Sequence, residues 1–302
     1  MPRQPSPRDS AALLWPPLAR FIAGDSALGE AAAALGPWEA GLYEFGRFGA
    51  KQGWACLFGG IMVALLIGTH LVYPRGAALA RYDFLVLAAL AVQAALLAFR
   101  LETWEEAKVI LLFHLVGTAI EIFKTAVGSW IYPEPSLLRI GGVPLFTGFM
   151  YACVGSYIAR AWRLFDFRFR RHPPVWSLVA FSVAIYVNFF SHHYAPDLRV
   201  ILFGATALLF GRTIIFFKVW RAYRQMPLLL GFGLVAVFIW FAENIGTASG
   251  AWLYPNQRAV WSMVSPAKLG SWFLLMIISY SLVASLNRPQ PLGSIGDGGR
   301  SS

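Results

Sequence analysis

Long apolar stretches alternate with short polar or charged connections between residues 52 and 287. Each stretch has about the length that a helix, rising about 1.5 Å per residue, needs to cross a hydrocarbon core of about 30 Å. The pattern predicts an all-α membrane protein with about eight transmembrane helices. They are expected at residues 53–73, 82–99, 106–128, 143–163, 175–193, 199–219, 227–250 and 265–286.

The two ends of the chain differ from this apolar middle. Residues 12–22 and 37–49 mix aromatic side chains with isolated charges and helix breakers, so they are too short and too polar to span a membrane. We expect residues 1–51 to form a cytoplasmic segment with interfacial pieces. Residues 288–302, rich in Gly, Ser and Pro, are expected to be a disordered cytoplasmic tail, and residues 1–12 should be disordered as well.

One sequence motif occurs twice. Residues 121–133 read EIFKTAVGSWIYP and residues 243–255 read ENIGTASGAWLYP, with Glu, Thr, Ala, Gly, Trp, Tyr and Pro at the same offsets. The same shift of 122 residues aligns further Trp, His and Pro residues at the ends of the expected helices. We therefore predict two parallel four-helix repeats, residues 52–164 and 174–287. An even number of helices returns the chain to the same side, so the repeats should be related by a pseudo-two-fold axis along the membrane normal.

Composition supports a membrane protein. Hydrophobic residues make up 58% of the chain and charged residues 13%, with a mean hydropathy of +0.58, which is unlike a soluble globular domain. The net charge of +10 could indicate nucleic acid, but no basic stripe with interleaved aromatics occurs, so we expect the lipid bilayer and no nucleic acid as partner. Most lysines and arginines, including the cluster at 160–172, fall on the side of the N-terminus. The positive-inside rule then predicts that both termini are cytoplasmic.

Glu121 and Glu243 are the strongest candidates for a chemical role. Each lies about twelve residues, or roughly 18 Å, before the proline that ends its motif, which places it near the middle of the membrane. A carboxyl group there is costly, by about 3 kcal/mol on insertion scales, and normally faces the bundle interior or a wet cavity. Parallel repeats would bring the two glutamates together as an acid–base pair. The alternative is an interhelical hydrogen bond with a structural role, to Thr125 or Thr247.

The two copies of the motif differ at one charged position. Lys124 lies one turn above Glu121, whereas the second copy has Gly246 at the corresponding place. Lys124 should hold Glu121 ionised, while Glu243 has only Asn244 nearby in sequence and should favour its protonated form in a low dielectric. We therefore predict an asymmetric site with Glu121, Glu243 and Lys124 as catalytic residues.

Polar and aromatic residues near the glutamates are the expected ligand contacts. His114 and Thr125 belong to a polar stripe on the helix of Glu121, although a histidine there can also be a core residue bonded to a carbonyl. The Trp and Tyr residues of the motif either form an aromatic belt at the membrane surface or line the site. The predicted substrate-binding residues are His114, Thr125, Trp130, Tyr132, Trp240, Asn244, Thr247, Trp252 and Tyr254.

No pattern indicates a metal, a cofactor or nucleotide-driven chemistry. The sequence lacks the Walker, GxSxG, HExxH and GxGxxG motifs, and no spacing of His and Glu places metal ligands on one helix. We expect neither a metal nor a cofactor. Cys56 and Cys153 lie in apolar runs and are interpreted as small hydrophobic side chains rather than as a disulfide.

Three stretches carry a resemblance to a known family: KQGWACLFGGIM (residues 51–62), VPLFTGFMYACVGSY (residues 143–157) and the paired E…T..G.W.YP motifs. Together they resemble the YoaT-like integral membrane family, domain of unknown function 817, over residues 35–287. The resemblance implies a bacterial multi-pass protein of the inner (plasma) membrane, and it implies no activity.

Three functions remain open at this stage. The first is an intramembrane enzyme acting on a lipid or isoprenoid-like substrate, in which Glu243 donates a proton, Glu121 accepts one, and Trp130, Trp240 and Trp252 stabilise a cation through their ring faces. The second is a proton-coupled transporter of a small solute. The third is a non-catalytic membrane component, and the sequence predicts no particular oligomeric state.

Overall fold

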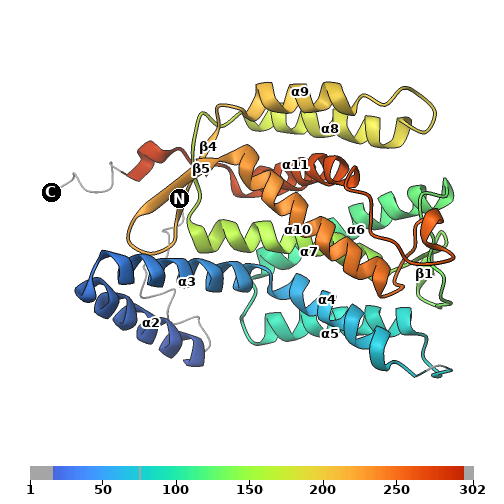
Figure 1. Ribbon diagram of the computed structural model, residues 1–302, viewed down its shortest axis with the longest axis horizontal. Coiled ribbons are helices and arrows are strands. Elements are labelled where there is room, and N and C mark those ends of the chain that lie inside the picture. The colour runs from blue at the N-terminus through green and yellow to red at the C-terminus, as the bar shows by residue number, and fades with distance from the viewer. Residues whose placement is uncertain (1–15, 75, 296–302) are drawn as a thin grey trace.

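A computed structural model describes residues 16–74 and 76–295 of the chain. Most of it is helical, and the helices of the main bundle run along the long axis of the molecule (Figure 1). These helices are α4 (Leu57–Val72), α5 (Arg81–Ala98), α6 (Trp104–Ala126), α7 (Phe146–Phe165), α8 (Val175–Ser191), α9 (Arg199–Phe210), α10 (Leu228–Ala248) and α11 (Lys268–Asn287). A helix therefore occurs in each of the eight places predicted from the apolar pattern.

Only some of these helices have the length and composition of a membrane span. Within the described residues four qualify, namely α5, α6, α10 and α11. α4 qualifies only together with α3 (Pro37–Ala55), as one span bent by 67°, which would make five. α8 and α9 are apolar but shorter. α7 is 20 residues long, but it carries Arg160 and Arg163 and is not apolar enough. Apolar helices of spanning length thus indicate a membrane protein.

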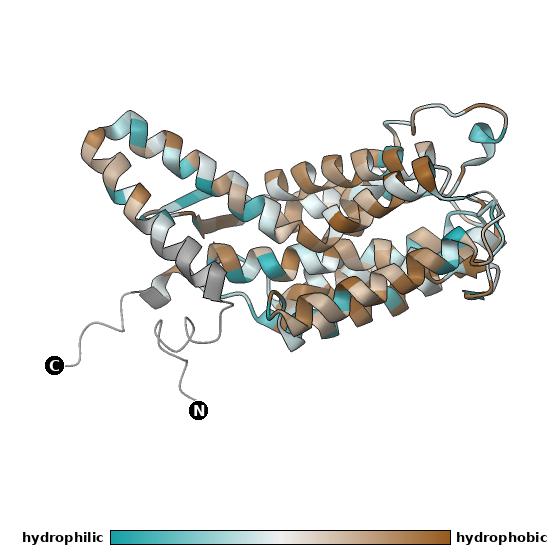
Figure 2. Ribbon diagram, turned by 90° about the horizontal axis from the view of Figure 1, so that it is seen from below, coloured by the Kyte–Doolittle hydropathy of each residue, from teal (hydrophilic) through white to brown (hydrophobic). Residues whose placement is uncertain are grey.

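The chain before the bundle forms a pair of helices. α2 (Pro16–Leu35) and α3 project from one end of the bundle, and they show mixed polar and apolar colouring where the bundle helices are mostly apolar (Figure 2). The interfacial pieces predicted at 12–22 and 37–49 fall largely within these longer helices. α3 ends at Ala55, and the chain bends by 67° at Cys56 into α4.

A small sheet at the same end of the bundle was not predicted. β3 (Arg168–Arg170), β4 (Ile214–Lys218) and β5 (Tyr223–Pro227) pair antiparallel in the order β3-β4-β5. The predicted helix at 199–219 is therefore wrong beyond Phe210. Residues 214–217 are two isoleucines and two phenylalanines, which suit a pleated surface that can pack on one face. A short hairpin of β1 (Arg139–Ile140) and β2 (Val143–Pro144) lies at the opposite end (Figure 1).

α7 is the central helix of the bundle and packs against α3, α4, α5, α6 and α11. Its closest neighbour is α6, and small residues allow the approach. A Cβ atom added to Gly117 of α6 would lie 2.6 Å from the Cβ of Tyr151 on α7. This contact fixes the position of the Tyr151 ring, which belongs to the site described below.

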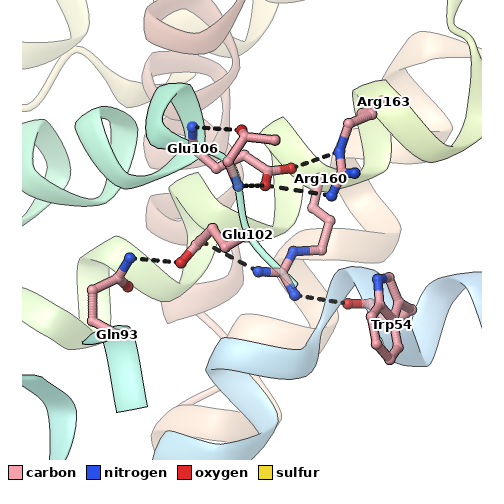
Figure 3. A network of polar contacts seen from close by, with 7 residues as sticks. Trp54, Gln93, Glu102, Glu106, Arg160 and Arg163 are labelled. Carbon is pink, nitrogen blue, oxygen red and sulfur yellow. Dashed lines mark hydrogen bonds and ion pairs between the residues drawn. The ribbon is translucent and has the colours of Figure 1, made fainter. Parts of the chain in front are cut away.

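A buried polar network ties α7 to the turn between α5 and α6 (Figure 3). The Arg160 guanidinium is fully buried and lies 3.3 Å from Glu102, which also accepts a hydrogen bond of 2.6 Å from Gln93. Arg163 pairs with Glu106 at 3.0 Å. Arg160, which belongs to the charged cluster at 160–172, is therefore buried and paired with a buried carboxylate.

The predicted disordered ends lie mostly outside the described residues, which begin at Pro16 and end at Ile295. The part of the C-terminal tail that is described is held by the sheet. The Phe169 N–H donates to the carbonyl of Gln290 at 3.0 Å, and a short 3-10 turn, η2 (Leu292–Ile295), follows.

Candidate functional site

A cavity of about 900 Å³ runs through the bundle, with a wall built mainly from α3, α4, α7 and α10. Almost all of its lining is apolar, and its charged lining residues are Glu121 and Glu243. Phe45 and Phe238 line it although they are 73% and 72% exposed, so the cavity is open to the outside of the bundle at these residues. The two glutamates predicted to meet in one place therefore do face one cavity.

Glu121 of α6 is buried and accepts hydrogen bonds on both carboxylate oxygens. Trp130 donates from Nε1 to Oε2 at 2.6 Å, and the Tyr132 hydroxyl donates to the same oxygen. The Tyr151 hydroxyl of α7 donates to Oε1 at 2.8 Å. Donors to a carboxylate favour its charged form, whereas burial opposes it, so these three bonds offset part of the cost of burying Glu121.

Glu243 of α10 is also buried, and its shell has fewer donors. The Tyr254 hydroxyl donates to Oε1, and Trp272 of α11 donates from its indole nitrogen to Oε2. None of the ion pairs among the described residues involves either glutamate. The two acids thus differ in their hydrogen bonds, whereas the predicted difference was a lysine beside Glu121.

The spacing that the two copies of the motif share follows from a helix end that turns back on itself. Gly128 and Gly250 adopt positive φ angles of 73° and 67° just after α6 and α10, a conformation that glycine adopts at low cost. The next residue then bonds back into the last turn, as Ser129 N–H does to the Lys124 carbonyl at 2.9 Å. Trp130, Tyr132 and Tyr254, which follow these turns, are thereby directed toward the glutamate of their own motif.

The two copies of the motif are joined to each other. Ile131 and Leu253, which stand at the same place in the two copies, exchange backbone hydrogen bonds of 2.9 and 3.0 Å. The Trp130 and Tyr254 rings lie edge to face with 6.1 Å between their centroids. These contacts hold the Glu121 and Glu243 shells against each other.

The motif aromatics do not form an aromatic belt. Trp130 and Tyr254 are only 9% and 7% exposed, and all four motif aromatics line the cavity. Burial raises the pKa of Tyr132 and of Tyr254 well above the usual value for a phenol, and the neighbouring glutamates add to this. Both phenols are therefore hydrogen-bond donors rather than phenolates. Trp252 makes no bond to a glutamate and packs instead on Gly246.

Lys124 does not approach Glu121 as predicted. Its ammonium group donates to the Phe189 carbonyl at 3.0 Å and lies 2.9 Å from His193 Nε2. Lys124 lies on the part of α6 that faces Phe189 of α8, and it is outside the cavity lining. The asymmetry of the site therefore does not come from an ion pair between Lys124 and Glu121.

Several other predicted ligand contacts lie outside the cavity lining. On α10, Trp240 donates to the Val264 carbonyl, Asn244 accepts from the Val264 N–H, and Thr247 accepts from Trp261. These three residues hold the loop that follows the motif. The His114 and Phe149 rings are tilted by 44° with 4.3 Å between their centroids, and Thr125 is partly buried. The structure thus places His114, Thr125, Trp240, Asn244 and Thr247 around the site and not in its lining.

Three residues near the glutamates were missed from the sequence. Tyr151 and Trp272 donate to them, and Lys268 lies over the Tyr254 ring, 4.5 Å from its centroid. Tyr and Trp in an apolar helix carry a polar tip that needs a buried partner. That signal was present at Tyr151 and at Trp272. The 122-residue shift pairs Tyr151 with Phe273 and Trp272 with Met150, so neither residue is repeated in the other half and the repeat did not reveal them.

Apolar helices of spanning length and two buried glutamates define a helical membrane protein with a polar site inside its bundle. The family model described as "Protein of unknown function (DUF817)" matches residues 44–280, and the chain belongs to this family. The chain is 44% identical over 243 residues to "Uncharacterized protein YoaT" of Bacillus subtilis (strain 168), covering 80% of this chain and 91% of the relative. The resemblance drawn from the sequence motifs is confirmed. No solved structure matches the chain.

Proposed function

We propose that this protein binds a lipid or isoprenoid-like molecule in its cavity and that Glu121 and Glu243 act on it as an acid–base pair. The observation that carries the proposal is the position of both glutamates in one apolar cavity of about 900 Å³. Cavities of this size are suited to a small molecule, and an apolar lining with a few convergent polar groups is typical of ligand sites.

The opening of the cavity supports an apolar ligand. Leu234 and Phe238 of α10 belong both to the lining and to the exposed surface of the bundle. In a bilayer this surface faces hydrocarbon, so a lipid chain can enter sideways without crossing water. A polar solute entering by the same route would lose its hydration, which is costly.

The hydrogen bonding supports an assignment of roles. Glu121, with three donors, is the base and Glu243, with two, is the acid. Glu243 gives its proton to one carbon of a C=C bond, which leaves a carbocation on the other carbon and a carboxylate on Glu243. Glu121 then removes a proton from a carbon next to the cation, and those electrons form the new C=C bond. The substrate keeps its composition, and the proton returns from Glu121 to Glu243 to complete the cycle.

Aromatic rings around the glutamates suit this intermediate. Trp130, Trp252 and Trp272 line the cavity, and ring faces stabilise a cation by about 1–2 kcal/mol each when water is excluded. Trp240, expected in this role from the sequence, is bonded to the Val264 carbonyl outside the lining.

We further propose that the protein is a multi-pass protein of the bacterial inner membrane with both termini cytoplasmic, built from two parallel four-helix repeats at 52–164 and 174–287. Two relationships support the repeats. The bounds of α7, shifted by 122 residues, give 268–287, the bounds of α11. The backbone bridges Ile131–Leu253 and Phe169–Pro291 each join residues that are 122 positions apart.

Deuterium exchange tests the chemistry directly. The purified protein in nanodiscs is incubated in D₂O with a lipid extract of the cells that express it, and mass spectrometry measures deuterium on carbon in the extracted lipids. Protonation of a C=C bond followed by loss of a neighbouring proton leaves solvent deuterium in the product. We expect incorporation with the wild-type protein and none with Glu121→Gln or Glu243→Gln.

A matched pair of glycines tests binding separately. Gly60 and Gly68 both lie on α4 with open space around an added Cβ atom, but only Gly60 lines the cavity. Gly60→Leu should reduce the amount of lipid that co-purifies with the protein, and Gly68→Leu should not. Lipid binding without any deuterium exchange would refute the acid–base role, and equal lipid content in the two glycine variants would refute binding in this cavity.

A further inference from the structure

Basic side chains from four separate segments gather at the end of the bundle that carries the motif loops. Lys124 lies in the last turn of α6, His192 and His193 follow α8, Arg199 begins α9 and Lys268 begins α11. The Lys124 ammonium lies 2.9 Å from His193 Nε2, the His192 and His193 ring centroids lie 4.2 Å apart, and Arg199 bonds to Ser271 of α11, the helix that Lys268 begins. We call these five residues the basic cluster.

Negative charge does not balance the basic cluster. Its acidic neighbour, Asp197, accepts from Arg199 Nε at 2.5 Å and from the Arg199 N–H at 3.0 Å, and it also accepts from Asn188. No ion pair among the described residues includes Lys124 or Lys268. Lys268 interacts electrostatically with Glu243, but both oxygens of that carboxylate are bonded to Tyr254 and Trp272.

Contacts with uncharged groups hold the donors of the basic cluster in place. These contacts do not neutralise the positive charge of the donors. The Lys124 ammonium is fixed by the Phe189 carbonyl and by the Phe189 ring, 3.9 Å from its centroid. Arg199 also donates to Ser271 at 3.2 Å, which joins α9 to α11. His193 is exposed, so the cluster is reached from outside the protein. Clustered like charges in a partly buried setting repel each other and are stabilised by a counter-ion.

We propose that the basic cluster is a binding site for an anionic group of the phosphate or sulfate type, supplied by a free anion or by a lipid headgroup. The site lies beside the proposed catalytic cavity and is separate from it, since none of the five residues belongs to the cavity lining. Its ligand contacts are charged hydrogen bonds from Lys124, Lys268 and Arg199, with His193 at the rim.

Thermal unfolding in nanodiscs tests the site. A ligand that binds only the folded state raises the unfolding temperature, and the free energy gained grows as RT ln(1 + L/Kd), where L is the free ligand concentration. Wild-type protein in phosphatidylcholine nanodiscs is titrated with sodium sulfate against sodium chloride at equal ionic strength, and a second series contains phosphatidylglycerol in place of part of the phosphatidylcholine. We expect stabilisation by sulfate, by phosphatidylglycerol or by both. A response to sulfate assigns a free anion, and a response to phosphatidylglycerol alone assigns a headgroup.

Charge-removing variants decide whether the effect belongs to the basic cluster. Lys124→Met and Lys268→Met should each weaken the apparent affinity by about tenfold or more, because a hydrogen bond to a charged group is lost. Arg258→Met removes an exposed positive charge at the same end of the bundle but outside the cluster and should respond as wild type does. Lys268→Arg, which keeps the charge, controls for misfolding. Equal stabilisation of all variants, or no stabilisation of the wild type by either anion, would overturn the proposal.

Discussion

The indole of Trp130 and the phenol of Tyr254 lie edge to face, at 87° and 6.1 Å, while each donates a hydrogen bond to the glutamate of its own motif. One aromatic contact therefore connects the hydrogen-bond shell of Glu121 with that of Glu243. A change in one shell should therefore alter the hydrogen bonds of the other.

Replacing Tyr132 and Tyr254 together should change the free energy of unfolding by an amount that differs from the sum of the two single changes. Residues that share a network show coupling of about 0.5–3 kcal/mol in a double-mutant cycle. We expect such coupling between Tyr132→Phe and Tyr254→Phe, measured by unfolding in detergent. Tyr223, in β5 at the other end of the bundle, supplies the comparison, because Tyr132→Phe and Tyr223→Phe should be additive. Additivity in the first pair would contradict a connected shell.

Tyr151→Phe should destabilise the protein by about 1–3 kcal/mol, since a buried carboxylate oxygen loses its hydroxyl donor. The bond concerned is the 2.8 Å contact from α7 to Glu121 Oε1. Tyr186→Phe is the control, because that ring stacks on Phe190 and its hydroxyl is not among the donors to either glutamate. Chemical denaturation of both variants checks the prediction, which fails if they lose the same stability.

Gly246→Ala should destabilise α10 by overpacking, by about 1–3 kcal/mol. An added Cβ atom at Gly246 would lie 2.1 Å from the Trp252 ring, whereas at Gly233 on the same helix nothing lies within 4 Å. Gly233→Ala should be neutral or stabilising, because alanine is the better helix former. Melting temperatures of the two variants give the comparison, and a stable Gly246→Ala would mean that Trp252 does not occupy this place.

Arg160→Met should cost about 3–5 kcal/mol, because it leaves the buried Glu102 carboxylate without its cation. The double variant Arg160→Met/Glu102→Leu should recover much of this loss, since no unpaired charge remains. Lys108→Met breaks a pair whose side chains are 69% and 80% exposed, and it should change stability little. If the single and double Arg160 variants are equally unstable, the charge of Glu102 is not the cause.

The burial of Glu102 also predicts that the stability of the protein depends on pH. Burial raises the pKa of this carboxyl above its ordinary value, although Arg160 opposes the rise. A carboxyl group whose pKa is raised by folding binds its proton more tightly in the folded state than in the unfolded state. The stabilisation that this proton gives to the folded state is fully present below the unfolded pKa, about 4.3. It is lost as the pH rises through the folded pKa. Acidification toward that value should therefore relieve the cost of burying Glu102. Between pH 7 and 4, the free energy of unfolding of the wild type should contain this pH-dependent contribution, and that of Glu102→Gln should lack it.

The apolar pattern was enough to place the helices, because a run of about 20 apolar residues has few alternatives in lipid. It failed at residues 214–218, where Ile and Phe are as suitable for a strand as for a helix and the pairing with β3 and β5 decides. The pattern also could not show the 67° bend at Cys56 between α3 and α4.

The site was predictable where its residues repeat and unpredictable where they do not. Glu121, Glu243 and the motif aromatics share offsets, and they do line one cavity. Lys124 was assigned from its distance along α6, but a neighbour one turn away can face another helix, as it does here. Tyr151 and Trp272 come from α7 and α11, and only tertiary packing brings such donors to a carboxylate.

The backbone pair of Ile131 and Leu253 imposes an order on biosynthesis. Ile131 stands between Trp130 and Tyr132, the two loop donors to Glu121, and its own hydrogen-bond partner lies 122 residues later in the chain. The surroundings of the first glutamate are therefore completed only after residue 253 has been synthesised. Until then the nascent first half carries a buried acid with an unfinished shell, so a chain stalled before the second motif should be a substrate for membrane quality control.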